Sequence, residues 1–161
     1  MIVYHTSTVE ISAPDICHSR EGLDFGKGFY CTLIRQQAVT YGQRFRLRGK
    51  PAILNEYTLD PEYVNSNFRK FDSYDQEWLD FIMANRQNLP VRPYDIIEGG
   101  IADDKIFRTI DLYLSGDITK TDALNRLRFE KPNHQICFRS QEAIDRYLHF
   151  SSSTTLWTDA E

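Results

Sequence analysis

Residues 24–32 read Asp-Phe-Gly-Lys-Gly-Phe-Tyr-Cys-Thr, and this stretch carries most of the information about the fold. Its two glycines predict a turn, and the residues that follow, from Phe29 to Thr32, favour a β-strand. Side chains alternate between the two faces of a strand, so we expect Phe29 and Cys31 to point into the core. Tyr30 and Thr32 then point to the opposite face. Taken alone, the stretch indicates a glycine turn that leads into a buried strand.

Short strands and helices alternate on both sides of this stretch. Apolar spacing predicts strands at 1–7, 52–59, 94–97 and 134–138. Apolar spacing and capping residues predict helices at 35–48, 103–115, 121–128 and 140–148. A further helix is expected after a capping box at 73–76. The sequence has no regular βαβ rhythm, no glycine-rich dinucleotide fingerprint and no P-loop. We therefore expect an α+β domain with a mostly antiparallel sheet system.

Length and composition favour a single globular domain. The chain has 161 residues and a net charge of −4, which argues against non-specific binding of nucleic acid by the molecule as a whole. We place the domain at residues 1–150. Residues 151–161 begin with Ser-Ser-Ser-Thr-Thr, and we expect them to form a polar C-terminal tail outside the core.

The sequence also predicts where the protein resides. It lacks a run of about 18 apolar residues, and its start lacks the basic and apolar regions of a secretory signal. The three cysteines, Cys17, Cys31 and Cys137, are an odd number without a C-x-x-C pair, which is typical of reduced thiols. We expect a cytoplasmic protein without a membrane span.

Two further motifs accompany residues 24–32: Tyr4-His-Thr-Ser7 near the start and Asn133-His-Gln-Ile-Cys-Phe138 near the end. With them, the sequence resembles the ADP-ribosyltransferase superfamily, in particular its poly-ADP-ribose-polymerase-like branch. There the first strand reads W/Y-H-G-S/T and the second reads F-G-K-G-I-Y-F before a helix. The chain is also similar to a small bacterial family of domains of unknown function with H-G-S, D-F-G-x-G-F-Y-x-T and N-x-Q motifs. The resemblance implies an ADP-ribosyltransferase-like split antiparallel β-sheet core with flanking helices.

The resemblance implies NAD⁺ as co-substrate and gives roles to the first two motifs. His5 would hold a ribose hydroxyl of the adenosine half, and Thr6 would contact the nicotinamide carboxamide through its backbone. Ser7 fits the small hydroxyl residue that comes next in the pattern and would be a further cofactor-binding residue. Thr6 replaces the superfamily's glycine, and a positive φ would be costly for a β-branched residue. Tyr30 and Tyr41 lie eleven positions apart, which matches the two tyrosines that flank the nicotinamide ring. The alternative for Tyr41 is a place in the helix core.

Gln135 occupies the position at which the resemblance implies a catalytic glutamate. Strand alternation puts Gln135 and Cys137 on one face and Ile136 and Phe138 on the core face, although a register shifted by one residue would select His134. A neutral amide keeps a hydrogen bond to the ribose but loses the charge. Because charge-assisted bonds are about twice as strong, turnover would be slower by roughly 10²–10³.

Asp103 and Asp104 are the candidates for a carboxylate supplied from elsewhere in the chain. They follow a Gly-Gly turn and open a predicted helix, so one of them would line the cleft beside the ribose. The alternative is that they cap the helix and interact with its dipole. No histidine or cysteine spacing typical of a metal site is present, so we expect no metal.

Arg44, Arg46, Arg48 and Lys50 gather at the end of a predicted helix. One explanation is a solvated helix end, where cations suit the helix dipole. The other is a contact patch for an acidic partner or a nucleic acid.

The function implied by the resemblance is mono-ADP-ribosyl transfer from NAD⁺ to an intracellular protein or nucleic-acid acceptor. Small stand-alone domains of this kind serve as bacterial toxins in toxin–antitoxin or conflict systems, so a small antitoxin protein is a further expected partner. A catalytically degenerate module that binds NAD⁺, ADP-ribose or a partner is the alternative from another class. A third possibility is an NAD⁺ glycohydrolase, in which water replaces the acceptor.

Overall fold

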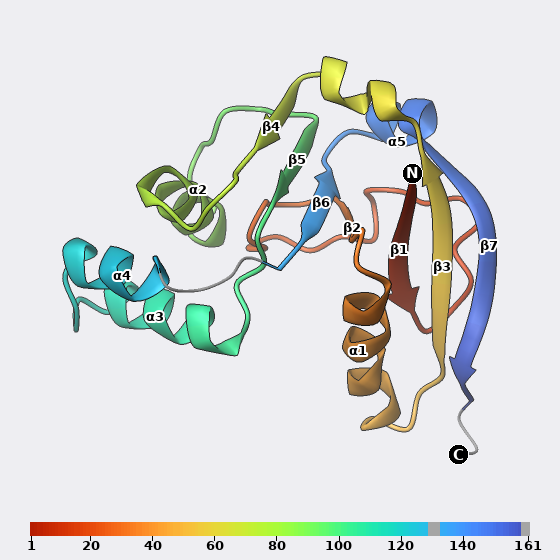
Figure 1. Ribbon diagram of the computed structural model, residues 1–161, viewed down its shortest axis with the longest axis horizontal. Helices are drawn as coiled ribbons and strands as arrows, with labels where there is room; N and C mark the ends of the chain where they lie inside the picture. The colour runs from red at the N-terminus through yellow and green to blue at the C-terminus, as the bar shows by residue number, and fades with distance from the viewer. Residues whose placement is uncertain (129–132, 159–161) are drawn as a thin grey trace.

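The computed structural model describes residues 1–128 and 133–158 of the protein, which adopt an α+β architecture (Figure 1). Two β-sheets and five α-helices make up this part of the chain. The elements are β1 (Ile2–Ser7), β2 (Phe29–Cys31), α1 (Arg35–Arg46), β3 (Ala52–Leu59), the 3-10 helix η1 (Pro61–Asn65), β4 (Phe68–Lys70), α2 (Gln76–Arg86), β5 (Ile96–Gly99), α3 (Asp104–Leu114), α4 (Lys120–Leu127), β6 (Gln135–Phe138), α5 (Gln141–Tyr147) and β7 (Leu148–Trp157).

The strands form two separate sheets. One has the order β1-β3-β7 and is antiparallel throughout, and the other has the order β2-β6-β5-β4, in which only β4 and β5 run parallel. An isolated bridge between Tyr4 and Thr32 joins β1 to the chain just after β2. The first and second sequence motifs therefore meet where the two sheets come together.

Two apolar cores lie on opposite faces of the four-stranded sheet. The first is shared with the three-stranded sheet and α5, and it contains Val3, Phe29, Tyr57, Phe138 and Ile144. The second lies under α2, α3 and α4, and it contains Phe25, Trp78, Ile97, Ile110 and Cys137. Helix α1 packs instead against β1 and β3 of the three-stranded sheet, apart from α3 and α4 (Figure 1).

The expected α+β class and mostly antiparallel sheets are confirmed, with differences at particular elements. Strand β3 has the predicted bounds. The capping box predicted at 73–76 is wrong, because Asp75 caps α2 by accepting from the amide of Trp78, while Ser73 only donates to Asp75. Helix η1 and strand β4 are additional elements that the sequence patterns do not predict.

The largest difference concerns the expected C-terminal tail. Residues 151–157 belong to β7, which pairs with β3 along the whole length of that strand. The expectation of a tail is therefore wrong as far as Trp157, because these residues form a strand, although none of residues 151–157 belongs to either apolar core. Residues 159–161 lie outside the described part. No helix among the residues that the structure describes is long and apolar enough to cross a membrane.

Candidate functional site

The glycine turn of residues 24–32 is held from both sides. Gly26 has φ +79°, a conformation that side-chain-bearing residues rarely adopt. A Cβ on Gly28 would lie 2.5 Å from both the Sγ of Cys137 and the carbonyl oxygen of Phe138. The hydroxyl of Tyr30 donates to the carbonyl of Gly26 over 2.5 Å and accepts from the amide of Phe25 over 3.1 Å. Tyr30 thus fastens the turn that precedes it.

His5 makes the closest contact between the first and second motifs. Its Nδ1 lies 2.6 Å from the carbonyl oxygen of Tyr30, and its ring stacks on Phe29 with the centroids 4.5 Å apart. Burial lowers the pKa of His5, and the bond to the Tyr30 carbonyl opposes that effect only in part. A neutral ring that donates from Nδ1 keeps Nε2 as a hydrogen-bond acceptor. Such an acceptor suits a hydroxyl group of a ligand.

Thr6 and Ser7 complete the first motif on β1. Thr6 is buried, and its hydroxyl donates to the carbonyl of Ala38 in α1 over 2.6 Å. It has no positive φ, so a β-branched residue is accommodated there without backbone strain. Ser7 is half-buried at the end of β1. Thr6 therefore attaches α1 to the three-stranded sheet.

Tyr41 lies on the outer side of α1. It is 47% exposed, and the guanidinium of Arg44 covers its ring at 3.9 Å from the centroid. Its edge contacts Phe45 at a centroid separation of 5.9 Å. The alternative of a place in the core is therefore wrong. No contact joins it to Tyr30 in the part of the chain that the structure describes, so the structure does not bring the two tyrosines together.

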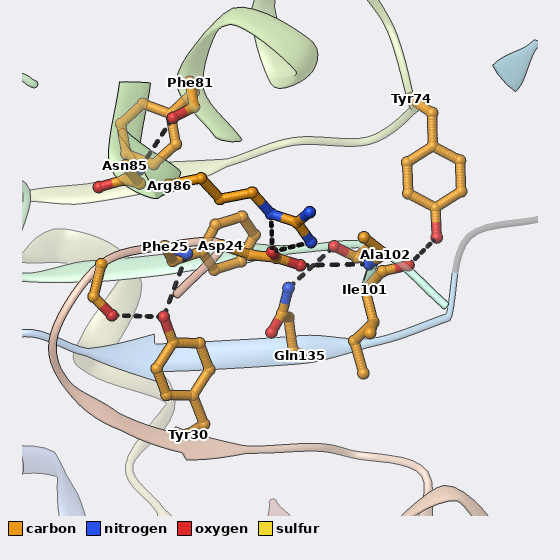
Figure 2. Close-up of polar contacts among 12 residues, drawn as sticks. Asp24, Phe25, Tyr30, Tyr74, Phe81, Asn85, Arg86, Ile101, Ala102 and Gln135 are labelled. Carbon is orange, nitrogen blue, oxygen red and sulfur yellow. Dashed lines mark hydrogen bonds and ion pairs between the residues drawn. The ribbon is translucent and has the colours of Figure 1, made fainter. Parts of the chain in front are cut away.

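Gln135 begins β6 and is 6% exposed. Its Nε2 donates to the carbonyl of Gly100 over 3.0 Å (Figure 2). The predicted alternation is confirmed: Cys137 lies in the core under the helices, whereas Ile136 and Phe138 lie in the core between the sheets. Tyr30 packs against the same core as Cys137, its register partner on β6. Gln135 and Tyr30 therefore belong to the same side of this sheet.

His134 lies on the other side and forms a buried polar network with Glu98. Its Nε2 is 3.0 Å from one Glu98 oxygen, and its Nδ1 accepts from the amide of Leu33 over 3.0 Å. The hydroxyl of Tyr63 donates to the second Glu98 oxygen over 2.9 Å. Because both ring nitrogens are engaged, His134 holds the chain at the start of α1 and is poorly suited to proton transfer.

The pKa of Glu98 reflects two opposing influences. Burial favours the neutral carboxyl and acts to raise its pKa, but the bonds from His134 and Tyr63, together with the charge of Lys70, outweigh burial. The net result is a pKa below the usual value for glutamate. The sequence does not single out Glu98, since its partners lie about 35 positions away in the chain.

Asp103 caps α3. Its carboxylate accepts from the amides of Lys105 and Ile106, over 3.1 and 3.0 Å. Asp104 is exposed in the first turn of the same helix. The capping alternative therefore holds for Asp103, and no contact among the described residues links either aspartate to Gln135.

A different carboxylate, Asp24, reaches the loop beside Gln135. Arg86 donates to it from Nε and from one terminal nitrogen, over 2.9 and 2.8 Å, and both side chains are nearly buried. The other Asp24 oxygen accepts from the amide of Ala102, two residues beyond the Gly100 carbonyl that Gln135 contacts. Figure 2 shows the glycine turn, the loop after β5 and the start of β6 meeting at this point. Asp24 belongs to the second motif, but its partner Arg86 gives no sequence signal.

Two hollows lie on the surface, and the second of them borders the glycine turn at Gly26 and Lys27. One of about 560 Å³ is lined by residues 12–15 and 141–150, and the other, of about 250 Å³, by Gly26, Lys27, Arg139 and residues of 85–93. Neither is lined by His5, Tyr30 or Gln135. No group of three or more possible metal ligands was found within residues 1–128 and 133–158.

The comparisons with known proteins give one result. A family model described as "Protein of unknown function (DUF3990)" matches residues 1–150. No curated protein and no solved structure matches the chain. The matched range covers most of the chain, so the chain belongs to the family described as DUF3990.

Proposed function

We propose that the protein is a mono-ADP-ribosyltransferase that uses NAD⁺ to modify an intracellular target. The observation that carries the proposal is the contact between His5 and the Tyr30 carbonyl. It joins two motifs that resemble those of ADP-ribosyltransferases and leaves Nε2 of a neutral imidazole as an acceptor for a ribose hydroxyl. The split into two sheets that meet at these motifs is consistent with the same proposal.

The reaction breaks the bond between nicotinamide and the ribose anomeric carbon, and the electron pair leaves with neutral nicotinamide. A nucleophilic oxygen or nitrogen of the acceptor then bonds to that carbon and loses a proton to a base or to water. His5 would bind the adenosine ribose, and Thr6, Ser7 and Tyr30 would line the nicotinamide side. Gln135 would accept from the reacting ribose through its amide oxygen, while its Nε2 bond to Gly100 fixes the amide.

The missing negative charge at Gln135 predicts slow turnover. A glutamate would stabilise the positive charge that develops on the ribose, and one preorganised electrostatic contact of this kind contributes about 10²–10³ in rate. A Gln135→Glu variant adds this charge but replaces the Nε2 donor to the Gly100 carbonyl with a carboxylate oxygen, so transfer faster than wild type would show that the charge outweighs the lost bond. Asp24 is a carboxylate near the site, but its bonds to Arg86 and Ala102 suit it to shape the loop.

The test uses purified protein, biotinylated NAD⁺ and bacterial lysate with its nucleic acids retained. Labelled product should form with wild type and be lost in His5→Ala and Gln135→Ala. His149→Ala is the matched control, because His149 is an exposed histidine on β7 and outside the site. Loss of labelling in the control, or equal labelling in all variants, would contradict the assigned site. Growth arrest on expression, relieved by a small partner protein, would support a toxin role.

One observation favours a second candidate, a module that binds NAD⁺ or ADP-ribose without chemistry. Gln135 is almost completely buried, and its amide already bonds to Gly100. On this view NAD⁺ raises the melting temperature of wild type but not of His5→Ala, and no label is transferred. Release of nicotinamide without labelling would instead identify hydrolysis.

A further inference from the structure

The stretch from Arg35 to Pro51 differs in charge from the rest of the molecule. It holds five cationic side chains and no acidic one, although the chain as a whole has a net charge of −4. Four of the cations crowd the last turn of α1 and the turn that follows it. These four are all exposed, and they are Arg44, Arg46, Arg48 and Lys50.

Aromatic rings accompany these cations. The guanidinium of Arg44 stacks on the half-exposed ring of Tyr41 at 3.9 Å, and that of Arg46 lies 5.9 Å from the ring of Trp157 on β7. The end of α1 and the end of β7 lie on the same side of the molecule (Figure 1). We call the surface made by these four cations and the two rings the basic end of α1.

The charges of the basic end have no ion-pair partner in the part of the chain that the structure describes. None of its four cations forms an ion pair with a carboxylate of residues 1–128 or 133–158. The helix dipole accounts for cations in the last turn, where Arg44 and Arg46 lie. It does not account for Arg48 and Lys50, which follow the helix. Four cations on one surface, none of them paired with a carboxylate of the described residues, are suited to an external polyanion.

We propose that the basic end of α1 binds single-stranded nucleic acid. Three of its four cations are arginines, whose planar donors match phosphate oxygens in pairs. Stacking on Tyr41 leaves the outward donors of Arg44 available, and exposed rings beside arginines are the means by which proteins bind unpaired bases. An acidic protein would use the charges alone, whereas unpaired bases would also contact the part of the Tyr41 side chain that Arg44 and Phe45 leave exposed. The inference goes beyond the proposed function, since it concerns binding and requires no NAD⁺.

The test is fluorescence anisotropy with labelled single-stranded RNA and DNA of about 12 nucleotides, the matching duplex and a poly-glutamate peptide. In about 50 mM salt, the double variant Arg46→Gln/Arg48→Gln should bind single strands at least about tenfold more weakly than wild type. The slope of log affinity against log salt should fall by about 1.4, the value for two lost phosphate contacts. Tyr41→Ala should weaken the binding of single strands more than the binding of the duplex.

The matched control is Arg108→Gln/Arg126→Gln, which removes the same charge from exposed positions on α3 and α4. The affinity of this control for single strands should stay within about twofold of wild type. That result would show that binding depends on the basic end of α1 and not on the total charge of the protein. Equal weakening in both double variants, or no binding of single strands by wild type, would overturn the inference. Preferential binding of poly-glutamate would also overturn it and identify an acidic protein as the partner. Because the assay contains no NAD⁺, its failure is distinguishable from failure of the transferase proposal.

Discussion

Replacement of Gly28 by alanine tests whether packing against β6 requires this glycine. The added Cβ would lie 2.5 Å from the Cys137 sulfur and 2.5 Å from the Phe138 carbonyl oxygen, so each contact must open by about 1 Å to reach an ordinary distance. The carbonyl belongs to a strand that is paired on both sides, with β2 and with β5, and cannot move alone. Overpacking of a rigid core costs about 1–3 kcal/mol, and we expect a loss near 3 kcal/mol.

The assay is equilibrium unfolding in urea, supported by a thermal melt in which this loss corresponds to a fall of roughly 6–12 °C. Gly49→Ala is the control, because Gly49 has φ +62° but no atom within 4 Å of the position that a Cβ would take, so it tests conformational strain of about 1 kcal/mol alone. In a Cys137→Ala background the Gly28→Ala cost should shrink without vanishing, since the carbonyl remains. If Gly28→Ala costs no more than Gly49→Ala, the packing explanation is refuted.

Three further predictions concern titratable groups. Burial lowers the pKa of His5 below 6.5 in the folded protein. The contribution of His5 to the free energy of unfolding is therefore complete above about pH 6.5 and is lost as the pH falls through the folded pKa. Urea midpoints of His5→Gln should depend less on pH in that window. The pKa of Glu98 lies below 4.5, so its contribution is lost only as the pH falls below about 4.5, and Glu98→Gln should flatten the dependence there while leaving the His5 window unchanged. Iodoacetamide should alkylate the exposed Cys17 in the native protein and spare Cys31 and Cys137, because burial raises the pKa of both thiols, that of Cys137 to about 12. Mass spectrometry that finds Cys137 modified as fast as Cys17 would contradict the buried position of β6.

Elements with strong local signals were predictable from the sequence. The bounds of β3 follow from its apolar pattern, and the alternation of Gln135 to Phe138 correctly assigned these side chains to the two faces of β6. Asp75 displaced Ser73 as the cap of α2 although either side chain can cap a helix. Here the choice depends on where the chain enters the helix, which the local sequence does not specify.

Contacts between distant residues escaped prediction. The Glu98 network joins side chains from η1, β5 and the approach to β6, and the pair of Asp24 and Arg86 spans the glycine turn and the end of α2. Each partner alone has the pattern of an ordinary polar residue. Only the sheet order places them together, and no periodicity encodes it. For the same reason, the sequence favours Asp103 and Asp104 for the carboxylate role, although Asp24 is the carboxylate that reaches the loop beside Gln135.

Strand β7 has a practical consequence for work with shortened forms of the protein. The family match ends at residue 150, yet β7 continues to Trp157 and forms one flank of β3. A fragment cut at residue 150 would expose most of one side of β3 as an open row of amides and carbonyls, where a second molecule can add a strand. Such a fragment should self-associate, and its loss of solubility would be misread as a property of the family domain.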